Sequence, residues 1–570
     1  MLYMHSGFFE LSDSLFMRLS DNYFRYNYKI FDRSINLCYN VIYDSIYNFS
    51  IRRKDMVNVR PYNNKQQLLF PPCIGDFIPE DDDVHIIDEV VEILDLSEYY
   101  KDIPRVGNPS YDPKMMIKVI FAGYYYNVYS SRKMWEMIMS NVRFIYLAGM
   151  QRPNFRTISD FRKDNIEKLK KTFIEILRIC KELGLIELEV IAIDSKVMKA
   201  NAGKGKGYTE EQLSEEMKEI EEEIKAYLER GVKEDEEEDE RYGRENSGRE
   251  IPEGIRKKEE RVVKIKEAIK KIREEKEKGK TRKEEERVNL TDKDAKLQNN
   301  KGKIEYGYRG EVVVDGGSQI ILAVDVVAEQ NDQKQLIPMV EQLINNIKEA
   351  GMEKKGKKIG LLGDCGYGTV ENFKEIKERG YDKLIDFYIP DKIMEQERRG
   401  KGGSNKGDMR FDKSKFKYDK VRDVYICPNG KELKKVRESY SRGVKRWIYR
   451  AEGGCRGCKY YGECTRNKSG RIVTRLEGQE LIDKMRKKLR SKKGKEVYWR
   501  RKTIVEPVIG NMSYNMGFTE FLLRGLRKVK GEYILVAIGH NLKKITNYIR
   551  EKFKVIRGVI INRGIVYNTS

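Results

Sequence analysis

The fold is decided by the stretch Val190–Lys196, which reads VIAIDSK. Four apolar residues, three of them β-branched, lead directly into the carboxylate of Asp194. This pattern predicts a short buried strand that ends in an acid at an edge or cleft of a sheet. On its own, a turn aspartate that caps a strand end is the simpler interpretation.

The same pattern recurs later in the chain. A second apolar run, Ile359–Gly363, ends in Asp364, and a third acid, Glu506, lies where a helix is predicted to begin. Magnesium prefers oxygen ligands, and two such ions about 4 Å apart stabilise both the attacking and the leaving oxygen of a phosphoryl transfer. Two strand-end aspartates and one helical glutamate suit that site. The sequence therefore predicts Asp194, Asp364 and Glu506 as catalytic ligands of two Mg²⁺ (or Mn²⁺) ions.

Length and charge narrow the classes of partner. The chain has 570 residues, so several domains are expected. It carries 113 Lys and Arg against 91 Asp and Glu, a net charge of +22, which favours a polyanion as partner. No apolar run approaches the length that spans a bilayer, and no basic signal peptide opens the sequence. We therefore expect a cytoplasmic protein that does not associate with membranes.

The N-terminal part divides into two segments. Residues 1–55 are rich in Tyr, Asn, Ser and Phe, so we expect a disordered extension, with Met56 as an alternative start. Residues 56–185 show helical spacing of apolar residues, for example in Val84–Leu94. Pro113 suits the first position of a further helix. This segment is predicted to form a helical domain.

A possible DNA-binding element lies in the last of these helices. The predicted helix begins at a capping box near Thr157 and runs to about Leu183. Three cations, Arg156, Arg162 and Lys163, lie near its start. Short helices with such cations fit a helix-turn-helix-like DNA-binding domain. A helical bundle with solvated charges fits equally well, and the sequence leaves both interpretations open.

Strand patterns return after residue 300. The apolar segments Ile304–Asp315 and Ile320–Val327 flank a hairpin turn signal. A helix, the strand before Asp364, a second helix and a last strand follow, at 333–350, 359–364, 369–378 and 387–390. Three antiparallel strands followed by parallel strands with helical connections predict a mixed α/β sheet, in the order of the RNase H-like fold. The predicted catalytic domain comprises residues 186–202, 301–392 and 501–550.

Two insertions interrupt this domain. Residues 203–300 are dominated by Lys and Glu, with apolar residues that alternate spacings of three and four on both sides of an acidic stretch. This pattern predicts an antiparallel helical hairpin. A solvated spacer is the alternative. Residues 393–500 form a second, basic insertion, and residues 551–570 form a C-terminal tail.

The second insertion holds a set of four cysteines, Cys427, Cys455, Cys458 and Cys464. Soft thiolates in a set of four suit tetrahedral Zn²⁺, and the Cys455/Cys458 pair has the spacing of a zinc knuckle. The spacing from Cys458 to Cys464 is longer than usual. A structural Zn²⁺ site and four reduced, unligated thiols are therefore both open.

Several short motifs match a known family in its own order. They lie within the ranges 63–79, 113–116, 193–196, 289–295, 363–367 and 498–528. On these motifs the chain resembles the DDE transposases of bacterial insertion sequences. The likeness is to the branch with an N-terminal helical domain and a Cys-bearing insertion before the final Glu, and it extends from Met56 to about Lys544.

The resemblance implies an activity. Such a protein binds the inverted-repeat ends of a mobile element in double-stranded DNA, cleaves strands and transfers the 3′-hydroxyl ends to target DNA, acting as a homodimer. Asp194, Asp364 and Glu506 would be its metal-binding triad. Tyr498 and Arg501 would lie near the DNA backbone.

One departure from the family concerns a cation. The family often has Lys or Arg seven residues after the glutamate, and here that residue is Ser513. Arg524 and Lys528 are the candidates to replace it in binding DNA. Two alternatives to an active transposase are a catalytically inactive DNA-binding remnant and an RNase H-like nuclease without strand transfer.

Overall fold

The computed structural model describes residues 73–103, 109–242, 253–277, 287–300, 302–330, 333–354, 356–398, 411, 413–441 and 444–562. The predicted extension 1–55, the alternative start at Met56 and the end of the predicted tail lie outside these ranges. The chain is a mixed α/β protein of two compact units, with boundaries at 186/187 and 537/538. The second boundary falls within helix α17 (Leu526–Asn562). Residues from Ile538 thus group with the N-terminal helices, although the sequence placed residues up to 550 in the catalytic domain.

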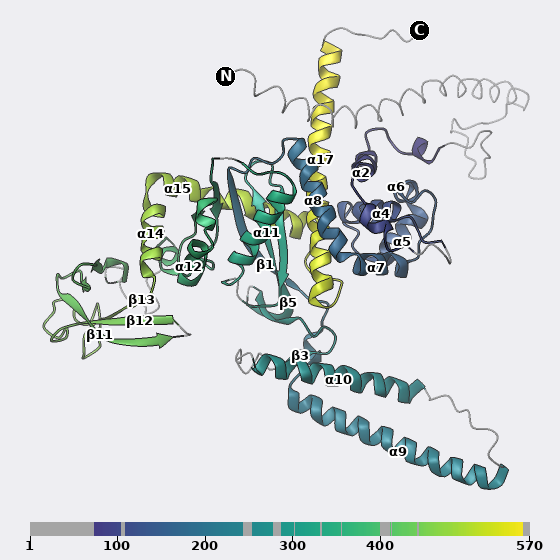
Figure 1. The fold of residues 1–570 in the computed structure, drawn as a ribbon, viewed down its shortest axis with the longest axis horizontal. Coiled ribbons are helices and arrows are strands. Elements are labelled where there is room, and N and C mark those ends of the chain that lie inside the picture. Colours follow the sequence, from purple (N-terminus) through teal and green to yellow (C-terminus); the bar gives the residue numbers. More distant parts are fainter. Residues whose placement is uncertain are drawn as a thin grey trace, which may run out of the picture. The chain divides into compact units, whose positions relative to one another are not determined.

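The first unit is helical (Figure 1). Its helices, besides the later part of α17, are α2 Asp83–Glu92, α3 Ser97–Tyr100, α4 Pro113–Tyr125, α5 Ser131–Ser140, α6 Val142–Leu147, α7 Phe155–Asp164 and α8 Ile166–Glu182. Helix α4 is buried along most of its length and begins at Pro113, as predicted. The hydroxyl of Tyr125 on α4 lies 3.0 Å from that of Thr546 on α17 and donates to Asp83 at 2.6 Å. Polar contacts thus fasten α17 to α4 and α2.

One predicted helix of this unit is two helices. The stretch from Thr157 to Leu183 was expected to be continuous, but α7 ends and α8 begins at Asn165. The side-chain amide of Asn165 donates to the carbonyl of Phe161 at 2.9 Å, which competes with the helical backbone. The N-cap of α7 is Asn154, whose side chain accepts from the backbone N–H of Thr157.

The second unit is built on a six-stranded sheet (Figure 1). Its strands are β1 Val190–Lys199, β4 Lys296–Asn300, β5 Lys303–Asp315, β6 Ile321–Val327, β7 Ile359–Leu362 and β8 Ile385–Tyr388. Strand β5 is antiparallel to β1, β4 and β6, and β7 is parallel to both β1 and β8. Strand β4 was not predicted, because the sequence assigned residues up to 300 to the insertion. Helices α11 Leu336–Glu349, α12 Val370–Glu378 and α16 Arg501–Gly510 belong to the same unit.

The decisive strand is longer than predicted. The apolar run was expected to end at Asp194, but β1 continues to Lys199 because β5 offers partners along its whole length. The parallel pairing with β7 stops at Ala192 and Leu362. Asp194 therefore lies in the middle of β1, just past the end of its neighbour β7, and Asp364 lies two residues past the end of β7.

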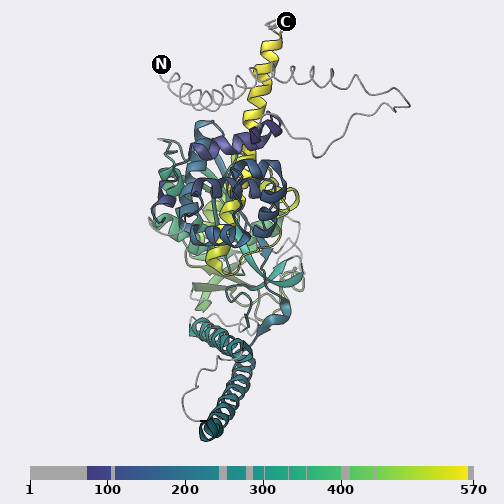
Figure 2. The same ribbon diagram turned by 90° about the vertical axis from the view of Figure 1, so that its right-hand side faces the viewer.

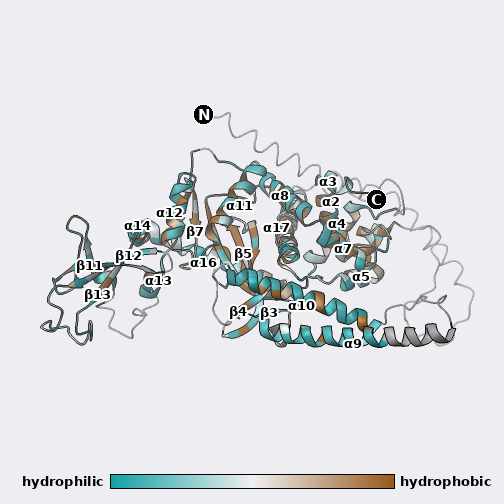
Figure 3. Cartoon of the chain, turned by 60° about the horizontal axis from the view of Figure 1, so that its bottom comes forward, coloured by the Kyte–Doolittle hydropathy of each residue, from teal (hydrophilic) through white to brown (hydrophobic). Residues whose placement is uncertain are grey.

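The first insertion contains two long helices, α9 Glu210–Tyr242 and α10 Glu253–Glu277 (Figure 2). An apolar cluster at their base comprises Leu213, Ile265, Ala268, Ile269, Ile272 and Val288. Ion pairs join Glu216 to Arg261 and Glu223 to Lys258, as expected for antiparallel helices. Figure 3 shows α9 and α10 as largely hydrophilic, in contrast to the strands of the central sheet.

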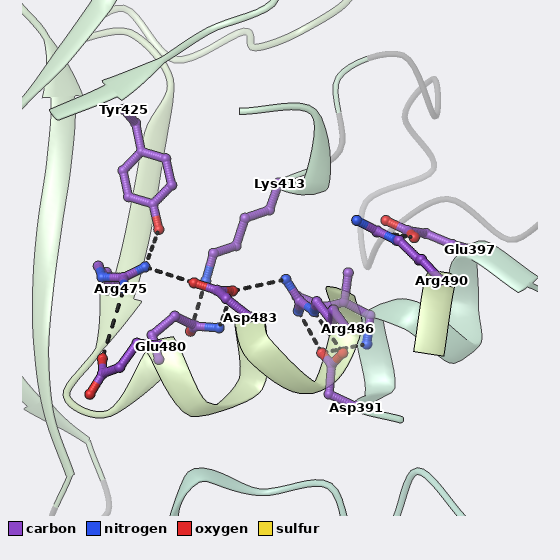
Figure 4. A network of polar contacts seen from close by, with 11 residues as sticks. Asp391, Glu397, Lys413, Tyr425, Arg475, Glu480, Asp483, Arg486 and Arg490 are labelled. Carbon is purple, nitrogen blue, oxygen red and sulfur yellow. Dashed lines mark hydrogen bonds and ion pairs between the residues drawn. The ribbon is translucent and has the colours of Figure 1, made fainter. Parts of the chain in front are cut away.

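The second insertion contains a five-stranded antiparallel sheet. Its strands, in spatial order, are β9 Lys417–Asp419, β10 Val424–Ile426, β11 Glu432–Ser441, β12 Val444–Ala451 and β13 Ile472–Leu476. Helix α13 Lys392–Arg398 precedes the sheet, and α14 Gln479–Arg490 and α15 Lys492–Trp499 follow it. A buried ion pair between Arg486 on α14 and Asp391, with two hydrogen bonds, holds this end of the insertion near the end of β8 (Figure 4). None of the helices that the structure describes is long and apolar enough to cross a membrane.

Candidate active site

The three predicted acids lie around one arginine at an edge of the central sheet. The guanidinium of Arg501, in the first turn of α16, donates to Asp194 at 2.8 Å and lies 3.4 Å from the carboxylate of Glu506. The second oxygen of Asp194 accepts from the backbone N–H of Ser195 at 2.8 Å. Arg501 thus bridges an acid on β1 and an acid on α16.

The third acid joins this group electrostatically. Asp364 accepts from the backbone N–H of Cys365 at 2.6 Å, and its charge acts on Asp194, Tyr498 and Arg501. The three predicted carboxylates are thus neighbours in the fold, although more than 140 residues separate each from the next along the chain (364 − 194 = 170; 506 − 364 = 142). We name Asp194, Asp364, Glu506 and Arg501 the acid cluster.

A proline fixes the helix that carries Glu506. Pro507 lies inside α16 and has no N–H, so the carbonyl of Thr503 loses its helical donor. The side-chain amide of Gln319, from the turn between β5 and β6, donates to that carbonyl at 3.1 Å instead. The helix is therefore anchored to the sheet at the turn that precedes Glu506. A π-helical turn, Asn511–Asn515, follows α16.

Burial and neighbouring charge oppose each other at this site. Burial is the largest effect on Asp194 and raises its pKa, and Asp364 raises it further, whereas Arg501 lowers it only in part. Burial acts to lower the pKa of Arg501, but Asp194, Tyr498 and Asp364 outweigh it, so that pKa is raised. The negative charge of the acid cluster is therefore incompletely compensated by its one arginine.

Two family models of transposases match the chain. A model described as "Transposase DDE domain" matches residues 426–546, which include Glu506, and one described as "Transposase domain (DUF772)" matches residues 72–164 in the helical unit. Both matches are to domains of transposases, in agreement with the resemblance that the sequence motifs indicate. No curated protein matches it. A piggyBac transposase, solved by cryo-EM in a synaptic complex with hairpin DNA, aligns over 85% of this chain and 82% of that one, with 7% identity and a TM-score of 0.25, too low to establish a shared fold.

The donor chemistry of the acid cluster fits a divalent cation, although the side chains are not arranged as a finished metal site. Among the described residues, no three His, Cys, Asp or Glu side chains are grouped closely enough to hold a metal ion. Asp194 and Glu506 nevertheless already share one cation, Arg501, and Asp364 lies within its electrostatic reach. Three carboxylates of this kind are suitable ligands for Mg²⁺ or Mn²⁺.

The four cysteines of the insertion line one small cavity of about 30 Å³. Three of their sulfurs accept polar hydrogens: Cys427 from the N–H of Lys431 at 3.2 Å, Cys455 from the N–H of Arg471 at 3.4 Å, and Cys458 from the amide of Asn429 at 3.5 Å. Burial raises the pKa of Cys464, and the other three thiols add to that increase. Cysteines far apart in the sequence therefore converge on one place, as free thiols.

The residues expected near DNA differ in burial and in their distance from the acid cluster. Tyr498 lies beside the acid cluster, and its hydroxyl is buried with no hydrogen-bond partner among the described residues. Arg524 and Lys528 are exposed, and Arg524 donates to the side chain of Asn201 at 3.2 Å. Lys196, for which the sequence predicted no role, contacts Ser513. The available signal was its position two residues after Asp194, on the same face of the strand.

One of the three cations in the helical unit has a structural role. Arg162 is buried and donates to the hydroxyl of Tyr124, the carbonyl of Tyr129 and the hydroxyl of Ser131. Because Arg162 is buried and these bonds hold its two terminal nitrogens inside the unit, it is not a surface contact for DNA. Arg156 is exposed, and Lys163 pairs with Asp160 at 2.7 Å.

Proposed function

We propose that the protein is the DNA transposase of an insertion sequence. It binds the ends of the element, cleaves DNA strands and transfers the 3′-hydroxyl ends to target DNA by two-metal phosphoryl transfer. The observation that carries this proposal is the gathering of Asp194, Asp364 and Glu506 around Arg501. Under this proposal all three are catalytic residues and metal ligands.

The sheet order supports an RNase H-like catalytic domain. The strands follow one another in space as β6, β5, β1, β7 and β8, with three antiparallel strands first and two parallel strands after them. The sequence predicted the same succession along the chain, three antiparallel strands followed by parallel ones, and this agreement supports the proposal. The proposed domain comprises residues 187–202, 302–392 and 501–537. It excludes residues 538–550, which the sequence placed in it, because these residues group with the helical unit.

The roles of individual side chains follow from the contacts. The three carboxylates would hold two Mg²⁺ or Mn²⁺ ions, which when bound supply activation of the attacking oxygen and stabilisation of the leaving one. Arg501 holds Asp194 and Glu506 near each other. Tyr498 and Arg501 would then contact the DNA backbone beside the cleavage site, where the buried Tyr498 hydroxyl would find a phosphate acceptor.

The partners follow from charge and from the reaction. A net charge of +22 favours the phosphates of double-stranded DNA, both the element ends and the target. Transposition joins two ends, so we propose a homodimer on DNA. Such a protein would act in the cytoplasm, at the nucleoid.

The test uses the purified full-length chain, Mg²⁺ and labelled DNA that carries the inverted repeats flanking its reading frame. We expect cleavage and joining by the wild type, and loss of cleavage with binding retained in Asp364→Asn. Asp382→Asn, which changes an exposed acid, is the matched control. Binding without cleavage by the wild type would indicate an inactive DNA-binding remnant. Cleavage without joining to a target would indicate a nuclease.

We also propose a structural Zn²⁺ ion at the cysteine cavity, because four thiols line it. Binding would draw these thiols closer together than they lie in the structure, where they are not grouped as metal ligands. The ion would link the loop after β10 to the segment between β12 and β13. Metal analysis of the purified chain tests this directly. We expect one Zn per chain in the wild type and in Cys73→Ser, whose thiol is exposed elsewhere, and less in Cys458→Ser. Four thiols that titrate with no bound zinc would contradict it.

A further inference from the structure

Beside the acid cluster lies a second group of contacts between β1 and the segment after α16. Lys196 follows Asp194 by two residues on β1, so both side chains project from the same face of the strand. The ammonium of Lys196 donates to the hydroxyl of Ser513. It also lies 5.7 Å from the centroid of the Tyr514 ring. Lys196, Ser513 and Tyr514 form what we name the lysine clip.

Ser513 is suited to hold a cation in place. It is 5% exposed, and its hydroxyl donates to the carbonyl of Ile509 at 2.7 Å. Because its hydrogen is used there, the oxygen of Ser513 accepts from the ammonium of Lys196. The π-helical turn Asn511–Asn515 presents both residues that contact the lysine.

The clip combines the two features that bind a nucleic-acid strand. Tyr514 is 78% exposed although it is a large aromatic residue, and the half-buried cation lies next to its ring. Aromatic rings stack on nucleotides without regard to sequence, and lysine binds the neighbouring phosphates as a compact charge. Lys196 shares strand β1 with Asp194, and the π-helical turn directly follows α16, which carries Glu506. A DNA strand that enters the acid cluster would therefore pass close to the clip.

We propose that Lys196 binds a phosphate of the DNA strand that enters the acid cluster, while Tyr514 packs against the adjoining nucleotide. This inference rests on the proposed function and adds a positioning residue to it. Position 513 is where the resemblance places a Lys or Arg on the helix. In this chain the neighbouring strand supplies the positive charge, and Ser513 anchors it.

The first test measures how the affinity for DNA depends on salt. The full-length protein is titrated with an element-end duplex in EDTA, which prevents cleavage, at several salt concentrations. Removing one phosphate contact lowers the slope of log affinity against log salt by about 1. We expect that change in Lys196→Gln but not in Lys196→Arg, which keeps the charge. Lys199→Gln is the matched control, since Lys199 lies on the same strand, is exposed and pairs with Glu520 at 3.1 Å.

A charge swap gives the sharper test. Lys196→Ser should lower the salt slope. Combining it with Ser513→Lys should restore the slope, because the positive charge is then supplied by residue 513 on the π-helical turn. Tyr514→Ala weakens binding at all salt concentrations without changing the slope, because the ring carries no charge. Thermal melting checks that every variant is folded, and Lys196→Arg guards against a purely structural effect.

The outcomes separate this inference from the proposed function. Suppose that the wild type cleaves DNA and that Asp364→Asn abolishes cleavage. Unchanged salt slopes in Lys196→Gln and Lys196→Ser would then overturn the proposed role of Lys196 and leave the proposed function intact. A slope that falls in Lys196→Ser but is not restored by the swap would overturn the claim that Lys196 replaces a cation at 513. A wild type that neither binds nor cleaves the element ends would overturn the proposed function itself.

Discussion

Two clusters of buried charge in the second unit are built differently. In the ion-pair network of α14, Arg486 donates twice to Asp391, at 2.8 and 2.6 Å, and these bonds outweigh burial and lower the pKa of Asp391 (Figure 4). In the acid cluster, Asp194 receives one bond from Arg501, and burial prevails and raises its pKa. Both clusters bury an aspartate beside an arginine, yet only in the first does the arginine outweigh burial.

The difference distinguishes a structural ion pair from a binding site. A bidentate pair satisfies both partners and needs no further ligand. Buried carboxylates with too few neighbouring cations are costly to keep charged, and an added cation would lower that cost. Groups of this kind occur preferentially at functional sites. The comparison predicts that changes in the acid cluster alter activity more than stability, and that changes in the network of α14 do the reverse.

The largest effect is expected at Asp194. Asp194→Asn removes a proposed metal ligand, so DNA cleavage should fall by at least about 10³-fold, the scale of losing a major electrostatic contributor. The melting temperature should stay the same or rise, because a buried charge with little compensation disappears. Cleavage assays and thermal melting on one preparation measure both. A large loss of stability would remove the distinction between the two clusters.

A large loss of stability is expected at Arg486. Arg486→Met leaves Asp391 buried without its partner, which should destabilise the protein by about 3–5 kcal/mol. Urea unfolding followed by far-UV circular dichroism measures the change. Arg490→Met is the matched control on the same helix, because its pair with Glu397 is half-exposed and should contribute less than about 1 kcal/mol. Equal effects of the two changes would contradict a structural role for the buried pair.

A smaller effect on binding is expected at Tyr498. Its buried hydroxyl has no hydrogen-bond partner among the described residues, so Tyr498→Phe should not lower the melting temperature. If DNA supplies the partner, affinity for the element end should fall by up to about tenfold, the value of one hydrogen bond. Unchanged affinity would exclude a contact between this hydroxyl and DNA.

The smallest effect depends on pH and concerns Lys413, in the network of α14 (Figure 4). Burial, followed by the charge of Arg486, lowers its pKa from 10.5 to about 8. Between about pH 8 and 10.5 the folded protein therefore binds fewer protons than the unfolded chain, so wild-type stability rises with pH there. Lys413→Met should be more stable than the wild type below pH 8. Thermal melting from pH 7 to 10.5 should show that advantage shrinking, and a constant difference would contradict the lowered pKa.

Much of the framework was predictable because its signals are local. The apolar runs before Asp194 and Asp364, the turn after Asp315 and the proline at the start of α4 each reside within a few consecutive residues. They gave the mixed sheet and the candidate acids. Local patterns were less informative where side chains compete with the backbone, as at Asn165, or where burial of an ordinary cation such as Arg162 depends on distant neighbours.

Extents and contacts needed the folded chain. The length of β1 was not predictable from its own residues, because it is fixed by the partners that β5 offers. The cysteines, spread from 427 to 464, reach one cavity only because the sheet from β9 to β13 folds between them. No strand pattern within the insertion predicted that sheet.

The sequence by itself determined which apolar runs are buried and which acids follow them, because hydrophobicity and its periodicity are properties of short stretches. Only the tertiary structure decided that Arg501 bridges Asp194 and Glu506, and that Lys196 meets Ser513 across 317 positions. Such contacts depend on how strands and helices pack. A chain encodes that packing through all its residues together, and no single stretch records it.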